Sequence, residues 1–175
     1  MKKIVYLGNM TPLVEMLRNR PGVELAGWIA EKEDLGDPLF RYFFEKSGVP
    51  SHAVGDSEAL SRALKELSFD LGILGNFGLL LTAQDLKTAP KGFVNLHLGL
   101  LPEHPGRHPI QNAISAVDKS VGVTLHRAVV KADAGPVIDR RATAMPESRR
   151  PEEVFQRLEI LAQKMLEDNL ERLLE

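Results

Sequence analysis

Three polar side chains have types and spacings that suit acid–base chemistry. Asn95 and His97 lie two positions apart at the end of an apolar run, so on a strand both would point to the same face. Asp133 lies 36 positions after His97 (133 minus 97), in an Asp-Ala-Gly turn between two apolar segments. An amide, an imidazole and a carboxylate can together stabilise a developing negative charge and move a proton.

Each of these residues also has a structural explanation. Asn95 and His97 could hydrogen-bond nearby backbone groups and fix the loop that follows, because most buried polar groups are paired in this way. Asp133 could bond its own backbone, as turn aspartates often do. Taken one at a time, the three residues do not distinguish a catalytic role from a structural one.

Residues 95–109 contain three prolines and two glycines, which predicts a long, stiff loop. The loop leaves the carboxyl end of an apolar strand, where ligands bind in open parallel sheets. Within it, Arg107 could bind a phosphate or carboxylate with both arms of its guanidinium, or it could simply be exposed. His104 and His108 have no metal-ligand spacing with His97, so we expect no metal site.

The order of the elements predicts one α/β domain over residues 1–175. Short apolar strands alternate with amphipathic segments up to residue 96, which indicates a mainly parallel sheet with helices on both faces. Residues 121–130 and 136–144 indicate an antiparallel pair, and a closing helix follows Pro151. Strands are expected near 4–7, 23–30, 49–54, 71–74 and 93–96, helices near 11–20, 39–48 and 57–67, and core aromatics at Trp28, Phe43 and Phe44.

Composition excludes several classes of function. The 22 basic residues nearly balance 24 acidic ones, and the pairs Arg140-Arg141 and Arg149-Arg150, which we expect to be solvated, are too short to bind nucleic acid. No cysteine is present to act as a nucleophile, which fits a reducing compartment. The apolar run 4–7 is too short for a signal peptide or membrane span. We therefore expect a cytoplasmic protein without nucleic-acid or membrane partners. The composition does not determine whether the protein forms a homo-oligomer.

The combination of motifs resembles the folate-dependent formyltransferases, which include the glycinamide ribonucleotide and methionyl-tRNA formyltransferases. Their pattern is Asn-x-His, Pro-Ser-Leu-Leu-Pro, Gly-Val-Thr-x-His and then Asp-x-Gly. In this chain, residues 95–97 read Asn-Leu-His, 98–102 read Leu-Gly-Leu-Leu-Pro, 122–126 read Gly-Val-Thr-Leu-His and 133–135 read Asp-Ala-Gly. The resemblance extends from about residue 70 to residue 140.

The resemblance implies a Rossmann-like formyltransferase fold and the transfer of a formyl group from 10-formyltetrahydrofolate to a primary amine, without a metal. Asn95 and His97 would stabilise the oxyanion. Asp133 would raise the pKa of His97, hold it charged and help to relay the proton. His126 is expected to be structural, on a strand facing the sheet edge. The residues that resemble a folate-binding wall are Asn76, Phe77, Gly78, Leu79, Leu80, Leu81 and Gly135.

The acceptor is expected to lie near Gly8, Asn9, Arg107 and His108. Residues 8–12 differ from the phosphate loop of the glycinamide ribonucleotide enzymes, although a helix N-terminus there could still hold a phosphate. The methionyl-tRNA enzymes have an extra C-terminal β domain, whereas this chain ends after one helix and has no basic patch. We therefore expect a small acceptor, an amino sugar or a nucleotide-linked amino sugar.

Three alternatives stay open at this point. A formyltetrahydrofolate deformylase would use water in place of the amine, but such enzymes usually carry an N-terminal regulatory domain. A glycinamide ribonucleotide formyltransferase is the second alternative. The third is a folate-binding relative without activity, because Leu98-Gly99 replaces the usual Pro-Ser after the catalytic histidine.

Overall fold

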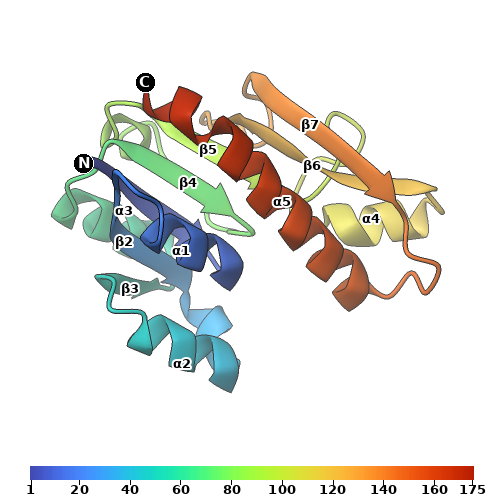
Figure 1. Ribbon diagram of the computed structural model, residues 1–175, viewed down its shortest axis with the longest axis horizontal. Coiled ribbons are helices and arrows are strands. Elements are labelled where there is room, and N and C mark those ends of the chain that lie inside the picture. The colour runs from blue at the N-terminus through green and yellow to red at the C-terminus, as the bar shows by residue number, and fades with distance from the viewer.

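A seven-stranded sheet forms the centre of the computed structural model, which describes residues 1–175 (Figure 1). The strand order is β3-β2-β1-β4-β5-β6-β7; the first five strands run parallel, while β6 and β7 pair antiparallel to their neighbours. The predicted α/β fold with an antiparallel C-terminal part is therefore confirmed. The strands are β1 (Lys2–Gly8), β2 (Val23–Glu31), β3 (Ser51–Val54), β4 (Leu71–Gly75), β5 (Phe93–His97), β6 (Ser120–Arg127) and β7 (Val137–Ala144).

Helices cover both faces of the sheet. The long helix α5 crosses one face beside α1 and α4, as Figure 1 shows, and α3 contributes to the core on the other face. No helix combines the length and the apolar character needed to cross a membrane. The helices are α1 (Thr11–Arg18), α2 (Pro38–Lys46), α3 (Ser57–Glu66), α4 (Pro109–Ser115) and α5 (Pro151–Leu174), with 3-10 turns η1 (Lys32–Gly36) and η2 (Asp85–Lys87).

Strand β1 shows why the sheet must be covered twice. Its side chains alternate between the two faces, so Ile4 and Tyr6 join the core under α1 and α5, while Val5 and Leu7 join the core under α3. All four side chains are fully buried. A strand that is apolar on both faces is typical of a parallel sheet between two helical layers.

Several local predictions are corrected. Thr11 and Pro12 are residue types that suit an N-cap and a first helical position, but the N-cap of α1 is Met10, which makes no side-chain cap. The acidic, glycine-containing segment 31–37 has the composition of a loop, but it contains η1. The predicted loop over 95–109 ends where Pro109 begins α4, since proline suits the first helical position. Phe43 is not a core residue but is 46% exposed.

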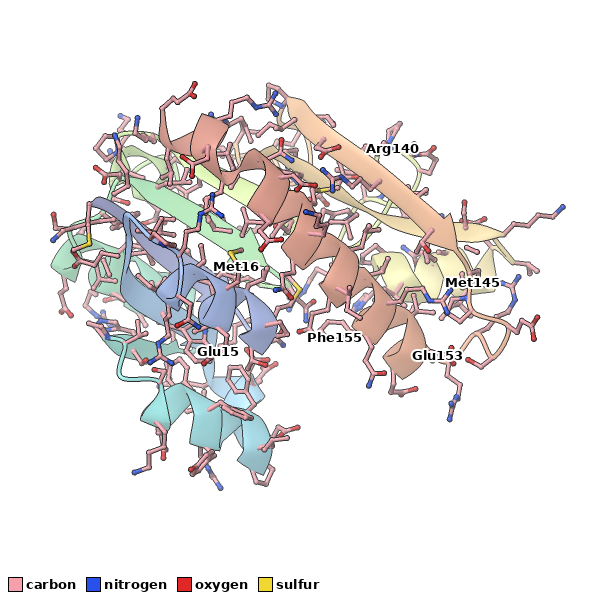
Figure 2. All side chains as sticks on the ribbon, in the orientation of Figure 1. Glu15, Met16, Arg140, Met145, Glu153 and Phe155 are labelled. Atoms are coloured by element: carbon pink, nitrogen blue, oxygen red, sulfur yellow. The ribbon has the colours of Figure 1, made fainter.

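The aromatic core lies at the end of the sheet near α2. Trp28 packs edge-on against Phe40 and Phe44, with ring centroids 5.5 and 4.8 Å apart. Met16 of α1 and Phe155 of α5 are partly buried against the same core (Figure 2). The expected core positions of Trp28 and Phe44 are confirmed.

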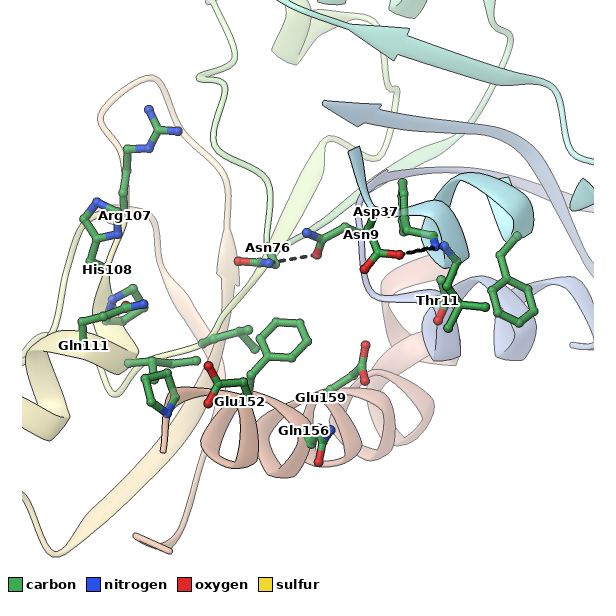
Figure 3. Close-up of a pocket in the computed structure, with 18 residues that line it drawn as sticks. Asn9, Thr11, Asp37, Asn76, Arg107, His108, Gln111, Glu152, Gln156 and Glu159 are labelled. Carbon is green, nitrogen blue, oxygen red and sulfur yellow. Dashed lines mark hydrogen bonds between the residues drawn. The ribbon is translucent and has the colours of Figure 1, made fainter. Parts of the chain in front are cut away.

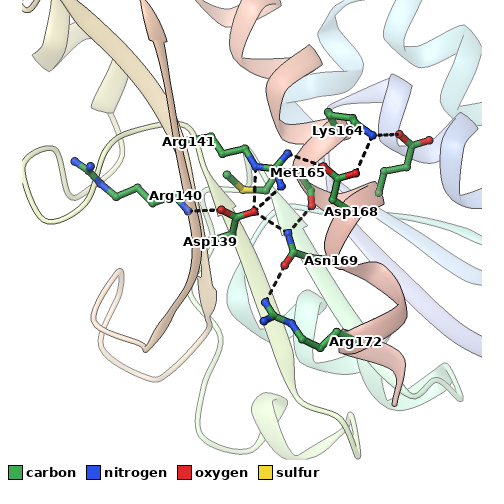
Figure 4. A network of polar contacts seen from close by, with 9 residues as sticks. Asp139, Arg140, Arg141, Lys164, Met165, Asp168, Asn169 and Arg172 are labelled. Carbon is green, nitrogen blue, oxygen red and sulfur yellow. Dashed lines mark hydrogen bonds and ion pairs between the residues drawn. The ribbon is translucent and has the colours of Figure 1, made fainter.

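A polar network ties α5 to β7 (Figure 4). The Arg141 guanidinium donates to Asp139 and Asp168 at 2.7 and 2.8 Å, and Asn169 of α5 donates to Asp139 at 2.8 Å. Arg140 pairs with Glu103 at 2.7 Å. Both arginines therefore make structural contacts and are not merely solvated: Arg141 holds α5 against β7, and Arg140 links β7 to the loop that follows β5.

Candidate active site

The carboxyl ends of the parallel strands meet at one edge of the sheet, and a cavity of about 290 Å³ opens there. We call it the inner cavity. Its wall includes Asn95, His97 and Asp133, so the structure brings together the three residues predicted to be catalytic. Its apolar wall is formed by Leu74, Phe77, Leu79, Leu80, Leu81, Leu96, Leu98, Ala128, Val129 and Ala132.

Asn95 is held by a histidine on the neighbouring strand. In the pairing of β5 with β6, Asn95 lies opposite His126, and their side-chain nitrogens Nδ2 and Nε2 are 3.2 Å apart. His126 Nδ1 lies 2.9 Å from the Arg127 carbonyl, so Nδ1 carries the proton in the neutral ring and Nε2 accepts from the Asn95 amide. The second N–H of Asn95 has no partner and is available to a bound oxygen.

The predicted place of His126 at the sheet edge is wrong. Strand β6 lies between β5 and β7 and not at the sheet edge, and His126 is 2% exposed. Its Nε2 also lies 3.6 Å from Asp133 Oδ1, so it contacts two of the three predicted catalytic side chains. The sequence did contain a sign that His126 lies near the site, because His126 ends the Gly-Val-Thr-x-His motif.

Asp133 is positioned by the loop that follows β5. Its Oδ2 accepts a hydrogen bond from the Gly106 N–H at 2.8 Å, and its Oδ1 lies 3.5 Å from His97 Nδ1. Burial raises the pKa of the Asp133 carboxyl, but contacts with His126, the Gly106 N–H and His97 outweigh burial and lower it. Asp133 is therefore a carboxylate at neutral pH.

The orientation of His97 is set by a backbone carbonyl. Its Nε2 lies 2.7 Å from the His104 oxygen, which only accepts, so Nε2 carries a proton. Nδ1 is then the one ring atom that can gain or lose a proton, and it faces Asp133. The His104 ring is in turn held by Asp118, with His104 Nε2 2.5 Å from the carboxylate.

The expectation that Asp133 holds His97 charged is wrong. Burial lowers the pKa of His97 and outweighs the His104 carbonyl and the Asp133 charge, which both raise it. His97 is only 6% exposed. The free energy needed to remove an imidazolium from water is larger than the stabilisation that these two partners give to the charged ring. At neutral pH, Nδ1 therefore carries a lone pair and is ready to accept a proton.

An NMR titration of the His97 imidazole protons should give a midpoint below about 6.5, the usual value for histidine. Asp133→Asn should move this midpoint further down, because the carboxylate favours the charged ring. Since the pKa is lower in the folded state, the stability that His97 contributes is complete above about pH 6.5 and is lost as the pH falls through the folded pKa. A midpoint above 6.5 would contradict this assignment.

The departure from Pro-Ser at residues 98 and 99 has a structural reason. A Cβ on Gly99 would lie 2.5 Å from Pro109 Cβ, 2.9 Å from His97 Nε2 and 3.1 Å from the His104 oxygen. Glycine thus allows the loop to place the His104 carbonyl on His97. The Leu98 side chain is buried and lines the cavity.

Gly99→Ala should therefore lower the free energy of unfolding by about 1–3 kcal/mol, the range for overpacking a close-packed site. Gly36→Ala is the matched control, because nothing lies within 4 Å of a Cβ there, and it should change stability by less than about 0.5 kcal/mol. Urea denaturation of both variants measures the difference. Equal stability of the two variants would show that the loop does not require glycine at position 99.

The residues predicted to bind folate separate into two groups. Asn76, Phe77, Gly78, Leu79, Leu80 and Leu81 all line the inner cavity. The Gly78 N–H donates to Glu31 at 2.6 Å, which fixes this segment to the end of β2. Gly135 lies outside the wall, and a Cβ on it would lie 1.8 Å from the Arg127 oxygen. The close approach of the Gly135 backbone to the Arg127 carbonyl explains why a glycine stands at this position.

A second cavity of about 730 Å³ lies beside the first (Figure 3), and we call it the outer cavity. Among the residues predicted to bind the acceptor, Asn9, Arg107 and His108 line both cavities, whereas Gly8 lines neither. The two cavities share six wall residues, namely Asn9, Asn76, Leu98, Arg107, His108 and Pro109. No three His, Asp or Glu side chains are arranged to hold a metal ion.

Comparison with known proteins decides the family. The family model described as formyl transferase matches residues 28–170 of this chain. The chain belongs to the formyl transferase family. The match includes Asn95, His97, His126 and Asp133, so the cluster lies within the part of the chain that defines its membership of the formyl transferases.

Relatives within the formyl transferase family are longer. The chain is 34% identical over 112 residues to the methionyl-tRNA formyltransferase of Pelagibacter ubique, covering 64% of this chain and 36% of that protein. It is 27% identical over 184 residues to the methionyl-tRNA formyltransferase of Thermotoga neapolitana, covering 98% of this chain and 58% of that protein. The chain thus spans less than two thirds of the length of these curated relatives.

Among solved structures, the phosphoribosylglycinamide formyltransferase from Bacillus halodurans is similar to the protein described here over 99% of this chain and 96% of that one. The TM-score is 0.81 and the sequence identity 24%. This similarity concerns the fold, and it confirms the predicted Rossmann-like formyltransferase architecture.

Proposed function

We propose that this chain transfers a formyl group from 10-formyltetrahydrofolate to the primary amine of a small acceptor, an amino sugar that is free or linked to a nucleotide. The observation that carries the proposal is the meeting of Asn95, His97 and Asp133 at the wall of an apolar cavity, in a chain of the formyl transferase family. An amide donor and a neutral imidazole beside a carboxylate are the groups that acyl transfer to an amine needs.

The inner cavity suits the folate donor. Ring systems of ligands bind preferentially in concave, mostly apolar sites with a few polar groups at one end. Phe77, Leu79 and Leu81 supply an apolar wall, while Asn95 and Asp133 supply the polar end.

Asn95, His97 and Asp133 have separate roles in this reaction. The free N–H of Asn95 donates to the formyl oxygen as negative charge develops on it. His97 Nδ1 takes the proton that the attacking amine loses, and Asp133, 3.5 Å away, stabilises the imidazolium that forms. The bond from the formyl carbon to the folate nitrogen breaks as the bond to the acceptor nitrogen is completed. The proton held by His97 passes to the folate nitrogen, which restores the neutral ring.

The test is to incubate the chain with 10-formyltetrahydrofolate, with and without amino sugars, and to follow the release of tetrahydrofolate. Release that depends on the amine and yields an N-formyl product is the expected result. Release that is independent of the amine would indicate a deformylase, and no release would indicate a binding protein. Either of these two outcomes would overturn the proposal.

A further inference from the structure

The outer cavity is lined mainly by neutral and acidic groups. Three carboxylates line it, from Asp37 at the start of α2 and from Glu152 and Glu159 on α5, against one guanidinium, that of Arg107. Neither Glu152 nor Glu159 has an ion pair or a hydrogen bond within the protein. Both side chains project from α5 into the hollow in Figure 3. Burial raises the pKa of Glu159, as expected for a carboxylate without a cationic partner.

Arg107 does not neutralise these carboxylates. Its Nη2 lies 2.5 Å from the position that a Cβ on Gly78 would take, and Glu31 Oε1 lies 3.0 Å from the same point. The guanidinium therefore lies toward the inner cavity, and Figure 3 shows it directed away from Glu152. The positive charge and the carboxylates of α5 thus belong to different parts of the combined site.

The N-terminus of α1 is poorly suited to hold a phosphate. The Met10 N–H already donates to the Tyr6 hydroxyl at 3.0 Å, and Pro12 has no N–H to offer. The Asn9 amide donates to Asp34 and accepts from Asn76, both at 2.8 Å. The N–H and hydroxyl of Thr11 are the donors left on the cavity side of this helix start, and the nearby Asp34 carboxylate would repel an anion there.

Aromatic rings complete the outer cavity. Phe40 and Phe43 of α2 and Phe155 of α5 line it, and Phe43 is 46% exposed although it is a large apolar side chain. Aromatic faces attract ammonium groups and pack against the apolar faces of small ring compounds. Carboxylates and aromatic faces together favour a cationic ligand over an anionic one.

We propose that the outer cavity selects an acceptor that carries a second ammonium group and no phosphate, such as a diamino sugar. This inference rests on the proposed function and narrows its acceptor. The amine to be formylated reaches toward His97, and the second ammonium pairs with Glu159 or Glu152. The two glutamates lie seven residues apart, two turns of α5, so they face the same side of the helix about 10 Å from each other.

The test compares three acceptors with the full chain and 10-formyltetrahydrofolate, namely a diamino hexose glycoside, its monoamino analogue with a hydroxyl in place of the second amine, and the monoamino hexose phosphate. The diamino sugar should exceed the monoamino sugar by about twofold to fivefold in kcat/KM, the factor for one solvent-accessible ion pair. The phosphate should be the poorest of the three. Glu159→Gln and Glu152→Gln should each reduce the preference for the diamino sugar.

Glu147→Gln is the matched control, because it removes one carboxylate from an exposed turn outside both cavities and should leave the preference unchanged. If the phosphate or the monoamino sugar is used equally well or better, the inference fails and the proposed function stands. If no amine releases tetrahydrofolate, the proposed function fails, and this inference fails with it.

Discussion

Replacing His97 by asparagine should lower kcat for formyl transfer by about 100-fold or more, the scale of lost acid–base help. Asparagine can still donate a hydrogen bond, but it cannot accept the proton that Nδ1 takes from the amine. The KM for 10-formyltetrahydrofolate should change little, because the apolar wall of the inner cavity stays intact. Steady-state kinetics with a saturating amine separates the two parameters.

Asp133→Asn should produce a loss of similar size, because the imidazolium formed during the reaction would lack its carboxylate. His52→Asn on β3 is the matched control; it makes the same substitution at a histidine outside both cavities and should keep full activity. Full activity of either His97→Asn or Asp133→Asn would show that the assigned roles are wrong.

Replacing Gly8 by alanine should lower the free energy of unfolding by about 4 kcal/mol or more, the range of severe single substitutions. Gly8 has a φ of +141°, and a Cβ there would lie 1.9 Å from the Gly75 carbonyl oxygen. The oxygen cannot move away easily, because Gly8 and Gly75 are paired in the ladder between β1 and β4. Denaturation in urea, with the wild type measured in parallel, gives the difference.

Gly22→Ala serves as the control for Gly8→Ala. Gly22 also has a positive φ, +79°, but nothing lies within 4 Å of the position of its Cβ. Gly22→Ala should lower the free energy of unfolding by about 1–2 kcal/mol, which is the strain of a left-handed conformation without a steric clash. Similar losses for the two variants would mean that the close approach of β1 to β4 is not a constraint.

The predictable part of the fold rests on local patterns. The apolar residues 4–7 form the centre of β1, and Asp56, a residue type that favours the N-cap position, caps α3 by accepting the Ala59 N–H at 2.8 Å. Such features depend on residues within a few positions of one another, so they can be read from the chain directly. The exposure of Phe43 could not be predicted from local patterns, because whether an aromatic ring is buried depends on which residues pack against it in the fold.

The candidate site was predictable in part for a related reason. Asn95, His97 and Asp133 stand in family motifs whose order and spacing can be recognised in the sequence. His126 also ends such a motif, but its contact with Asn95 depends on the antiparallel register of β5 and β6, which one sequence does not reveal.

Residue types and spacing along the chain were therefore enough to identify the α/β architecture, the formyl transferase motifs and the three polar residues of the site. The charge of His97 followed from the folded arrangement instead. Burial and the balance of distant partners, the His104 carbonyl and Asp133, determine its pKa. The acidic character of the outer cavity arises in the same way, because Asp37, Glu152 and Glu159 are far apart in sequence or on separate turns and meet only when α5 packs beside the sheet.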